Sequence, residues 1–343
     1  MRASSLLLFL AILLPAVAHC QALPADVRAG FQAEFQFSPE DFAKVESGRA
    51  VARMIPTGRP DDVRMAGIVL IKTSSERFIK AFNDIEQFEA SPEVVQTHRF
   101  SSPPAASDLT DYHADFKKPD VLACHPGHCW YKLPVEAMTN LQKDIDWDAP
   151  DANAKADELV RQRFAAYINN YRLNVDRALA VYYDTPQPYS LAEGLHSLIG
   201  SESQIADVIP ALLRFASDYP ANRPPNTEDF FYWQEAAFGL KHVLRAQHVI
   251  EQKLPVPGDP HYAIVSKMLF ASHYFRAAIE FMYAYPVRTP SGEPAIYLIS
   301  AQRSYIDGMT GVKGAFIRKI AQGRSPAKLA ENLELAKQRL EGH

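Results

Sequence analysis

Five segments with a strand pattern follow one another toward the C-terminus, and they constrain the fold more than any other feature of the chain. Aromatic and β-branched residues dominate them, and short connections separate them, as is typical of antiparallel strands. Residues 262–285 also fit a single helix, because their apolar period is ambiguous. The five segments are 230–238, 242–252, 262–271, 274–287 and 295–306.

The N-terminal half mixes strand and helix patterns. Residues 50–55 and 63–71 predict two strands joined by a turn at 57–61. Thr73-Ser74-Ser75 then supplies the cap of a helix whose apolar residues Phe78, Phe82 and Ile85 recur at helical spacing. Further strand patterns cover residues 94–100, 108–116, 121–124 and 129–133.

Two helical regions interrupt and end this strand pattern. Residues 135–216 carry three apolar stripes at helical spacing, broken by prolines, and predict a helical insertion. Near the C-terminus a further stripe precedes a helix that Ser325 can cap and Pro326 can begin. The residues expected to face inward here are Val312, Phe316 and Ile320, followed by Leu329, Leu333 and Leu340.

The first 22 residues have the pattern of an export signal. Arg2 supplies a positive charge, residues 6–14 are wholly apolar, and both Ala18 and Ala22 end small-residue cleavage patterns. The apolar run is too short to span a bilayer, and no later segment approaches the required length. We therefore expect removal of residues 1–18 or 1–22, a mature chain with no transmembrane segment, and a periplasmic or secreted location.

Cys20 raises an alternative in which the exported protein is a lipoprotein. A lipobox requires a small residue directly before the modified cysteine, and His19 is not small. The sequence therefore favours cleavage over anchoring through Cys20.

Composition excludes several classes of function. The chain of 343 residues is 47% hydrophobic and 22% charged, as expected for a protein that buries a core. Its 36 basic and 40 acidic residues give a net charge of −4, without the basic excess of a nucleic-acid binder. Neither phosphate-loop nor dinucleotide motifs occur, and we expect no cofactor and no metal.

Three segments resemble the START-like, or helix-grip, superfamily. Residues 64–78 are similar to its opening strand and helix, 297–302 to its last strand, and 311–341 to its long closing helix. The resemblance implies an α+β fold, in which a curved antiparallel sheet grips a long C-terminal helix around an apolar cavity. Residues 23–343 would then form one domain, and the insertion at about 135–216 departs from the compact family pattern.

The segment 124–129, Cys-His-Pro-Gly-His-Cys, predicts a disulfide. Pro126 and Gly127 suit the centre of a tight turn, which brings Cys124 opposite Cys129 with Cα atoms about 4.5 Å apart. That separation is at the short end of disulfide geometry, and export supplies an oxidising compartment. The rival interpretation, a metal site that combines both cysteines with a histidine, fits so short a turn poorly.

Several polar residues fall on apolar faces of the predicted strands. Alternation places Glu235 with Trp233, His248 with Leu244, Ala246 and Ile250, and His273 and Arg303 with further apolar neighbours. Inward polar groups need partners or a ligand. The candidate ligand-binding residues are therefore Trp233, Glu235, His248, His273 and Arg303.

Three functions remain open from the sequence. The resemblance favours an exported protein that binds a hydrophobic or amphipathic small molecule, such as a lipid, between the sheet and the C-terminal helix. Glu235, His248 and His273 could instead perform acid–base chemistry as a hydrolase- or cyclase-like enzyme, because histidine titrates near neutral pH. The same residues could brace a structural or interaction module without a ligand.

Overall fold

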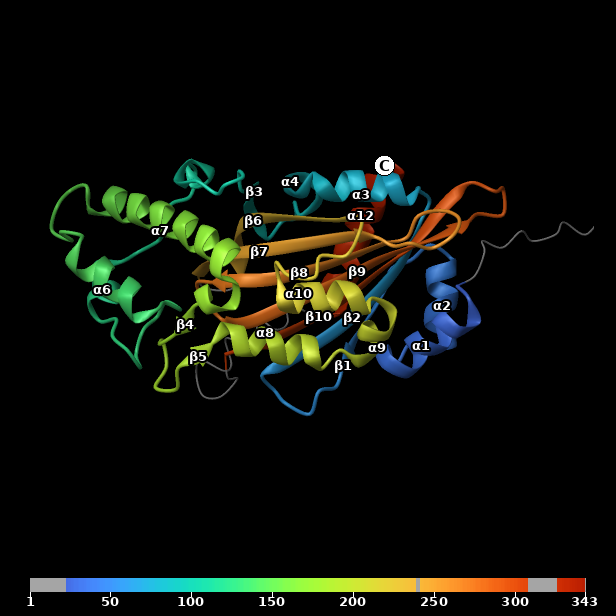
Figure 1. Cartoon of the computed structure of the whole chain (residues 1–343), viewed down its shortest axis with the longest axis horizontal. Coiled ribbons are helices and arrows are strands. Elements are labelled where there is room, and N and C mark those ends of the chain that lie inside the picture. The colour runs from blue at the N-terminus through green and yellow to red at the C-terminus, as the bar shows by residue number, and fades with distance from the viewer. Residues whose placement is uncertain (1–22, 239–240, 308–325, 343) are drawn as a thin grey trace, which may run out of the picture.

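The computed structural model describes residues 23–238, 241–307 and 326–342 (Figure 1). The predicted export signal with Cys20 and the stripe of Val312, Phe316 and Ile320 lie outside these residues. Within them the fold is mixed, with a large antiparallel sheet and a C-terminal helix. No helix of the described ranges combines the length and apolar character that crossing a bilayer requires.

Eight strands form the large sheet in the order β1-β2-β10-β9-β8-β7-β6-β3, and every neighbouring pair is antiparallel. The five C-terminal strand patterns are confirmed, and the single helix over 262–285 is wrong. A two-stranded sheet pairs β4 with β5. The strands are β1 (Val51–Ile55), β2 (Asp62–Ile71), β3 (Val94–Arg99), β4 (Val181–Tyr182), β5 (Tyr189–Ser190), β6 (Thr227–Phe238), β7 (Lys241–Lys253), β8 (Tyr262–Ala271), β9 (Phe275–Arg288) and β10 (Pro294–Ile306).

Helices precede, interrupt and follow the sheet. The predicted insertion is helical apart from the short β4–β5 ribbon, and the last helix begins at Pro326 as expected. The helices are α1 (Ala25–Phe35), α2 (Pro39–Glu46), α3 (Ser75–Asn83), α4 (Ile85–Phe88), η1 (Ala106–Leu109), α5 (Lys118–Leu122), α6 (Val135–Lys143), α7 (Ala152–Asn174), η2 (Val175–Ala178), α8 (Leu191–Gly200), α9 (Ser203–Val208), α10 (Pro210–Asp218) and α12 (Pro326–Glu341).

Three predicted strands, 108–116, 121–124 and 129–133, are wrong. The first contains the end of η1 and irregular chain, the second overlaps α5, and the third pairs with no other strand. Pro119 occupies the first turn of α5, where a missing N–H costs nothing. The alternating apolar residues here, including Tyr112, Val121 and Tyr131, are buried by packing rather than by strand pairing.

Both faces of the large sheet are covered. Alternate residues of β7 belong to different cores, with Val243 and Val249 beside α3 and α12, and Leu244 and Ala246 beside α7, α8 and α10. In Figure 1, α8 and α10 lie in front of the strands and α12 lies behind them. The sheet is therefore the middle layer between the helical insertion and the C-terminal helix.

Gly67 sets how closely α12 approaches the sheet. A Cβ atom at this position would lie 2.7 Å from Leu333 and 3.1 Å from Leu329. Both leucines are buried as predicted. The missing side chain of Gly67 therefore provides the space in which α12 packs on β2.

The disulfide between Cys124 and Cys129 is confirmed. The Cα atoms are 4.4 Å apart, and His125 and His128 exchange both backbone hydrogen bonds of the bridge that they close. Gly127 has a φ of 88°, the left-handed conformation that the second central residue of this turn requires. The cysteines are thus held in the non-hydrogen-bonded pair that the turn predicts.

Candidate functional site

A cavity of about 520 Å³ lies between the sheet and the helical insertion. Its walls come from α6, α7, the irregular segments 112–116 and 131–134, and the ends of β6, β7 and β8. The volume is within the range of ligand-binding pockets. Its lining includes the aromatic and aliphatic residues Tyr112, Phe116, Tyr131, Leu133, Leu159, Val160, Phe164, Tyr167, Leu244 and Phe270.

Helix α7 forms one wall of this cavity because one of its faces is apolar. Val160, Phe164 and Tyr167 lie three or four residues apart, and the ring of Phe164 packs edge-on against Phe270 of β8 at 5.4 Å. The Tyr167 hydroxyl donates to the carbonyl of Leu269 at 2.6 Å. This contact fixes the helix over the sheet and keeps the phenol ring in the wall.

A carboxylate–histidine pair lies in the polar part of the wall. Glu235 Oε1 is 2.7 Å from Nδ1 of His242, and Gln96 donates to Glu235 Oε2 at 2.8 Å. The pair spans β6 and β7, where Glu235 lies opposite Leu244 and His242 lies opposite Ala237. Sequence reasoning missed His242, although it shares the alternation of Leu244 and lies on the same face.

His273 lies in the same cavity wall, in the connection between β8 and β9. Its Nδ1 is 2.8 Å from Ser272 Oγ, and Nε2 is buried without a hydrogen-bond partner. Burial, together with the charges of Lys241 and Lys132, lowers the pKa of His273 to about 3. The imidazole is therefore neutral at physiological pH.

His248 lies elsewhere, in a closed aromatic cluster. It is fully buried, as predicted, between Phe231 at 4.5 Å and Tyr219 at 4.4 Å, measured between ring centroids. Its Nε2 is 3.2 Å from Asp229, and its Nδ1 is 3.2 Å from the Tyr171 hydroxyl. It is not among the lining residues of either cavity described in this section.

Trp233 and Arg303 also have structural partners. The fully buried Trp233 donates its indole N–H to the carbonyl of Asp108 at 2.8 Å. Arg303 pairs with Asp62 at 2.7 Å and with Glu202 at 3.0 Å, between β10, β2 and the start of α9. Of the five predicted site residues, the structure brings only Glu235 and His273 to one cavity.

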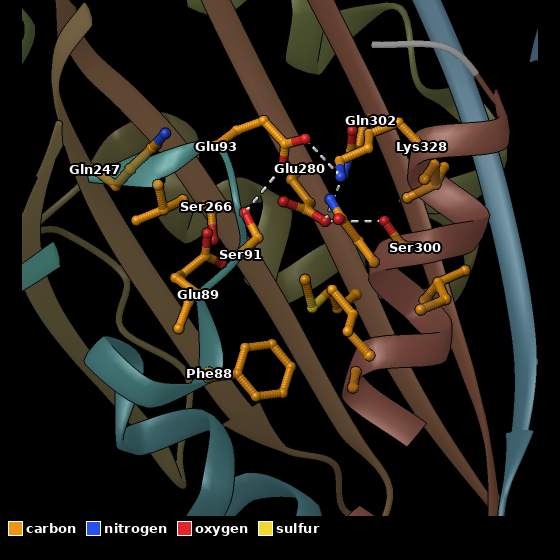
Figure 2. A pocket seen from close by; sticks show the side chains of 18 of the residues that line it. Phe88, Glu89, Ser91, Glu93, Gln247, Ser266, Glu280, Ser300, Gln302 and Lys328 are labelled. Carbon is orange, nitrogen blue, oxygen red and sulfur yellow. Dashed lines mark hydrogen bonds and ion pairs between the residues drawn. The ribbon is translucent and has the colours of Figure 1, made fainter. Parts of the chain in front are cut away.

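A smaller cleft of about 180 Å³ separates the opposite face of the sheet from α12. Figure 2 shows Glu280 of β9 in this cleft, with Lys328 of α12 beside it. Ser300 and Gln302 of β10 donate to Glu280 Oε1 at 2.8 and 3.0 Å. Burial, and then the nearby charge of Glu89, raises the pKa of Glu280.

The expected position of the ligand site under the C-terminal helix needs correction. The cleft against α12 contains none of the five predicted residues, and Glu235, His248 and His273 lie on or beside the face that the insertion covers. α12 packs against the other face. The prediction that His248 is buried is correct. The prediction that it lies on the sheet face covered by the C-terminal helix is wrong, because α12 covers the opposite face.

Metal chemistry finds no support among the described residues, where no group of three or more His, Cys, Asp and Glu side chains could hold an ion. Comparison with protein-family models, with curated proteins and with solved structures gives no match to this chain. No relative therefore supplies a ligand or an activity for either cavity.

Proposed function

We propose that this chain is an exported protein that binds an amphipathic small molecule, such as a lipid, in the cavity between the sheet and α6–α7. The observation that carries the proposal is the cavity itself, about 520 Å³, whose wall combines aromatic and aliphatic side chains with polar and charged ones such as Asp115, Arg163 and Lys241, as an amphipathic ligand requires. A filled structural module would not leave such a space, because protein interiors are close-packed.

The proposal includes a START-like fold. Its support is the chain order of β2, then α3 and α4, then antiparallel strands, and finally α12 against the sheet. The ligand cavity is then the one roofed by the insertion rather than the one beneath α12. The cleft at α12 is small and partly polar, which suits a long apolar ligand less well.

Export is part of the same proposal. It is supported by the tripartite pattern of residues 1–22 and by the disulfide between Cys124 and Cys129, a bond typical of oxidising compartments. N-terminal sequencing of the protein from a cell envelope tests it, and an intact Met1 would contradict it.

Native mass spectrometry of protein purified from its own cell envelope tests binding directly. We expect a bound small molecule in the wild type and its loss in Val160→Trp, because the indole would fill the cavity from α7. Leu173→Trp is the matched control, since Leu173 lies on the same helix and is 80% exposed. Wild-type protein without any bound mass, and without affinity for added amphiphiles, would refute the proposal.

A second candidate function is acid–base catalysis at Glu235 and His242. The observation that favours it is the 2.7 Å contact between them, which fixes the imidazole in a cavity wall. His242→Gln should then abolish turnover of a bound substrate while leaving its binding intact. Retention of the bound molecule unchanged after long incubation would instead favour binding without catalysis.

A further inference from the structure

The cleft of about 180 Å³ between the sheet and α12 combines a carboxylate in its floor with apolar walls. We propose that it binds a small organic cation, in which an ammonium group is attached to a short apolar or aromatic group. The ammonium donates a hydrogen bond to Glu280 Oε2, and the apolar part lies beside Phe88 and Leu333. The cleft is on the opposite face of the sheet from the cavity roofed by α6 and α7, so the inference does not depend on the binding function proposed above.

One carboxylate oxygen of Glu280 is an open acceptor in this cleft. Oε1 accepts hydrogen bonds from Ser300 at 2.8 Å and from Gln302 at 3.0 Å, whereas Oε2 accepts none from the described residues. Oε2 also remains accessible, since it is not among the buried side-chain atoms of the described chain that lack a partner. Glu280 lines the cleft, and its carboxylate extends into it in Figure 2. A ligand in the cleft can therefore reach this oxygen.

The cationic side chains that the structure describes in the cleft wall have partners other than Glu280. These partners are Glu93 (2.7 Å) and Glu331 (3.1 Å) for Lys328, the side-chain oxygen of Gln234 (2.9 Å) for Arg245, and the carbonyls of Phe88 (2.7 Å) and Ala90 for Arg339. Glu280 forms no ion pair with a described residue. The carboxylate in the floor of the cleft therefore lacks a counter-ion.

The missing counter-ion favours a cationic ligand over a neutral or an anionic one. Burial and then the charge of Glu89 raise the pKa of Glu280, and the opposing effect of Arg245 is smaller than that of Glu89. A charged group in such a place is costly unless a partner of opposite charge accompanies it. An ammonium group supplies both the charge and a hydrogen bond. An alcohol supplies only the hydrogen bond, and a carboxylate supplies neither.

The size and the apolar walls of the cleft limit the rest of the ligand. A cavity of about 150 Å³ accommodates benzene, so a cleft of about 180 Å³ accommodates a ligand with one ring. Met282 of β9 and Leu329 and Leu333 of α12 line it. Figure 2 shows the ring of Phe88 at one end of the cleft, away from Gln302. We therefore expect the apolar part of the ligand at the Phe88 end.

Three ligands that share a ring and differ in the charge of the head group test the inference. Benzylamine, benzyl alcohol and benzoate are titrated at pH 7 by calorimetry. We expect benzylamine to bind about tenfold more tightly than benzyl alcohol, and benzoate most weakly. Equal binding of benzyl alcohol, tighter binding of benzoate, or no binding of any of the three would overturn the inference.

Three variants assign the preference to its residue and its cavity. Glu280→Gln keeps an acceptor for Ser300 and Gln302 but removes the charge, and it should abolish the preference for benzylamine over benzyl alcohol. Glu228→Gln, at an exposed position on β6 outside the cleft, should leave the preference unchanged. Val160→Trp, which fills the other cavity, should also leave it unchanged, so that failure of this inference and failure of the proposed function are distinguishable. A preference that survives in Glu280→Gln would contradict the assignment, and the three wild-type titrations test the inference even if this variant does not fold.

Discussion

Tyr171 of α7 donates its hydroxyl hydrogen to Nδ1 of His248 on β7 across 3.2 Å. The direction follows from Asp229, whose pKa is lowered to about 2 and whose carboxylate therefore accepts the hydrogen of His248 Nε2. In the neutral ring Nδ1 can then only accept. This bond joins the helical insertion to strand β7 of the large sheet, although its partners are 77 residues apart in the chain.

Tyr171→Phe should lower the free energy of unfolding by about 1–2 kcal/mol, because Nδ1 of the buried His248 loses its donor. Urea unfolding measures the change. Tyr283→Phe is the matched control, since Tyr283 contacts His261 at 2.9 Å nearer the surface, where water can replace the hydroxyl. If both variants lowered the free energy of unfolding by the same amount, the hydrogen bond between Tyr171 and His248 would not contribute more to stability than a bond near the surface.

His248→Ala should destabilise the protein by about 2–4 kcal/mol and leave ligand affinity unchanged. The substitution empties a space between aromatic rings, leaves the Tyr171 hydroxyl without its acceptor and removes one of the donors to Asp229, which keeps Arg223 and Tyr219. Thermal unfolding and calorimetric titration of an amphiphile measure the two effects. If His248→Ala instead weakened ligand binding without lowering the thermal stability, His248 would have to be part of the ligand site.

The two buried histidines should each make a contribution to stability that falls as the pH is lowered from about 6.5 toward 4. Burial lowers the pKa of His248 to about 4 and that of His273 to about 3, so the unfolded chain takes up these protons first. Each histidine then contributes a slope of about 1.4 kcal/mol per pH unit. Urea unfolding at several pH values should show a shallower slope for His248→Gln than for the wild type. Identical slopes would exclude this linkage.

Gly67→Ala should cost about 1–3 kcal/mol of stability, because the added methyl group meets Leu333 and Leu329 where α12 packs on β2. Gly30→Ala, on α1 with open space around it, should be neutral or slightly stabilising. Chemical unfolding of both variants compares them. A neutral Gly67→Ala would mean that α12 can move away from the sheet without cost.

Reduction of the disulfide, or Cys124→Ala with Cys129→Ala, should cost only about 2 kcal/mol, because the bond closes a short loop. The hairpin retains backbone hydrogen bonds from Gly127 and Cys129 to residues 183 and 184. Mapping of non-reduced digests should give the linked peptide. Two free thiols in protein from an oxidising compartment would contradict the bond.

The sequence by itself determined the five C-terminal strands, the faces of their residues and the cysteine pair. Alternation put Leu244, Ala246 and His248 on one inward face, and the structure agrees. These features are local, because the side chains of a strand alternate with a period of two and a Pro-Gly turn sets which cysteines face each other. Alternation gave the wrong prediction for residues 108–133. The apolar residues of this region are buried by packing on neighbouring segments, and the region forms no strand of a sheet.

Only the tertiary structure decided which residues meet and which layer covers them. Glu235 and His248 share a face, but His248 lies opposite Phe231, and four residues of strand separate Phe231 from Glu235 by about 13 Å. His242 instead reaches Glu235 across the neighbouring strand. Both sheet faces are apolar and both are covered, so alternation cannot tell the insertion from α12. Long-range packing alone makes that choice, and it puts the larger cavity beneath α6 and α7.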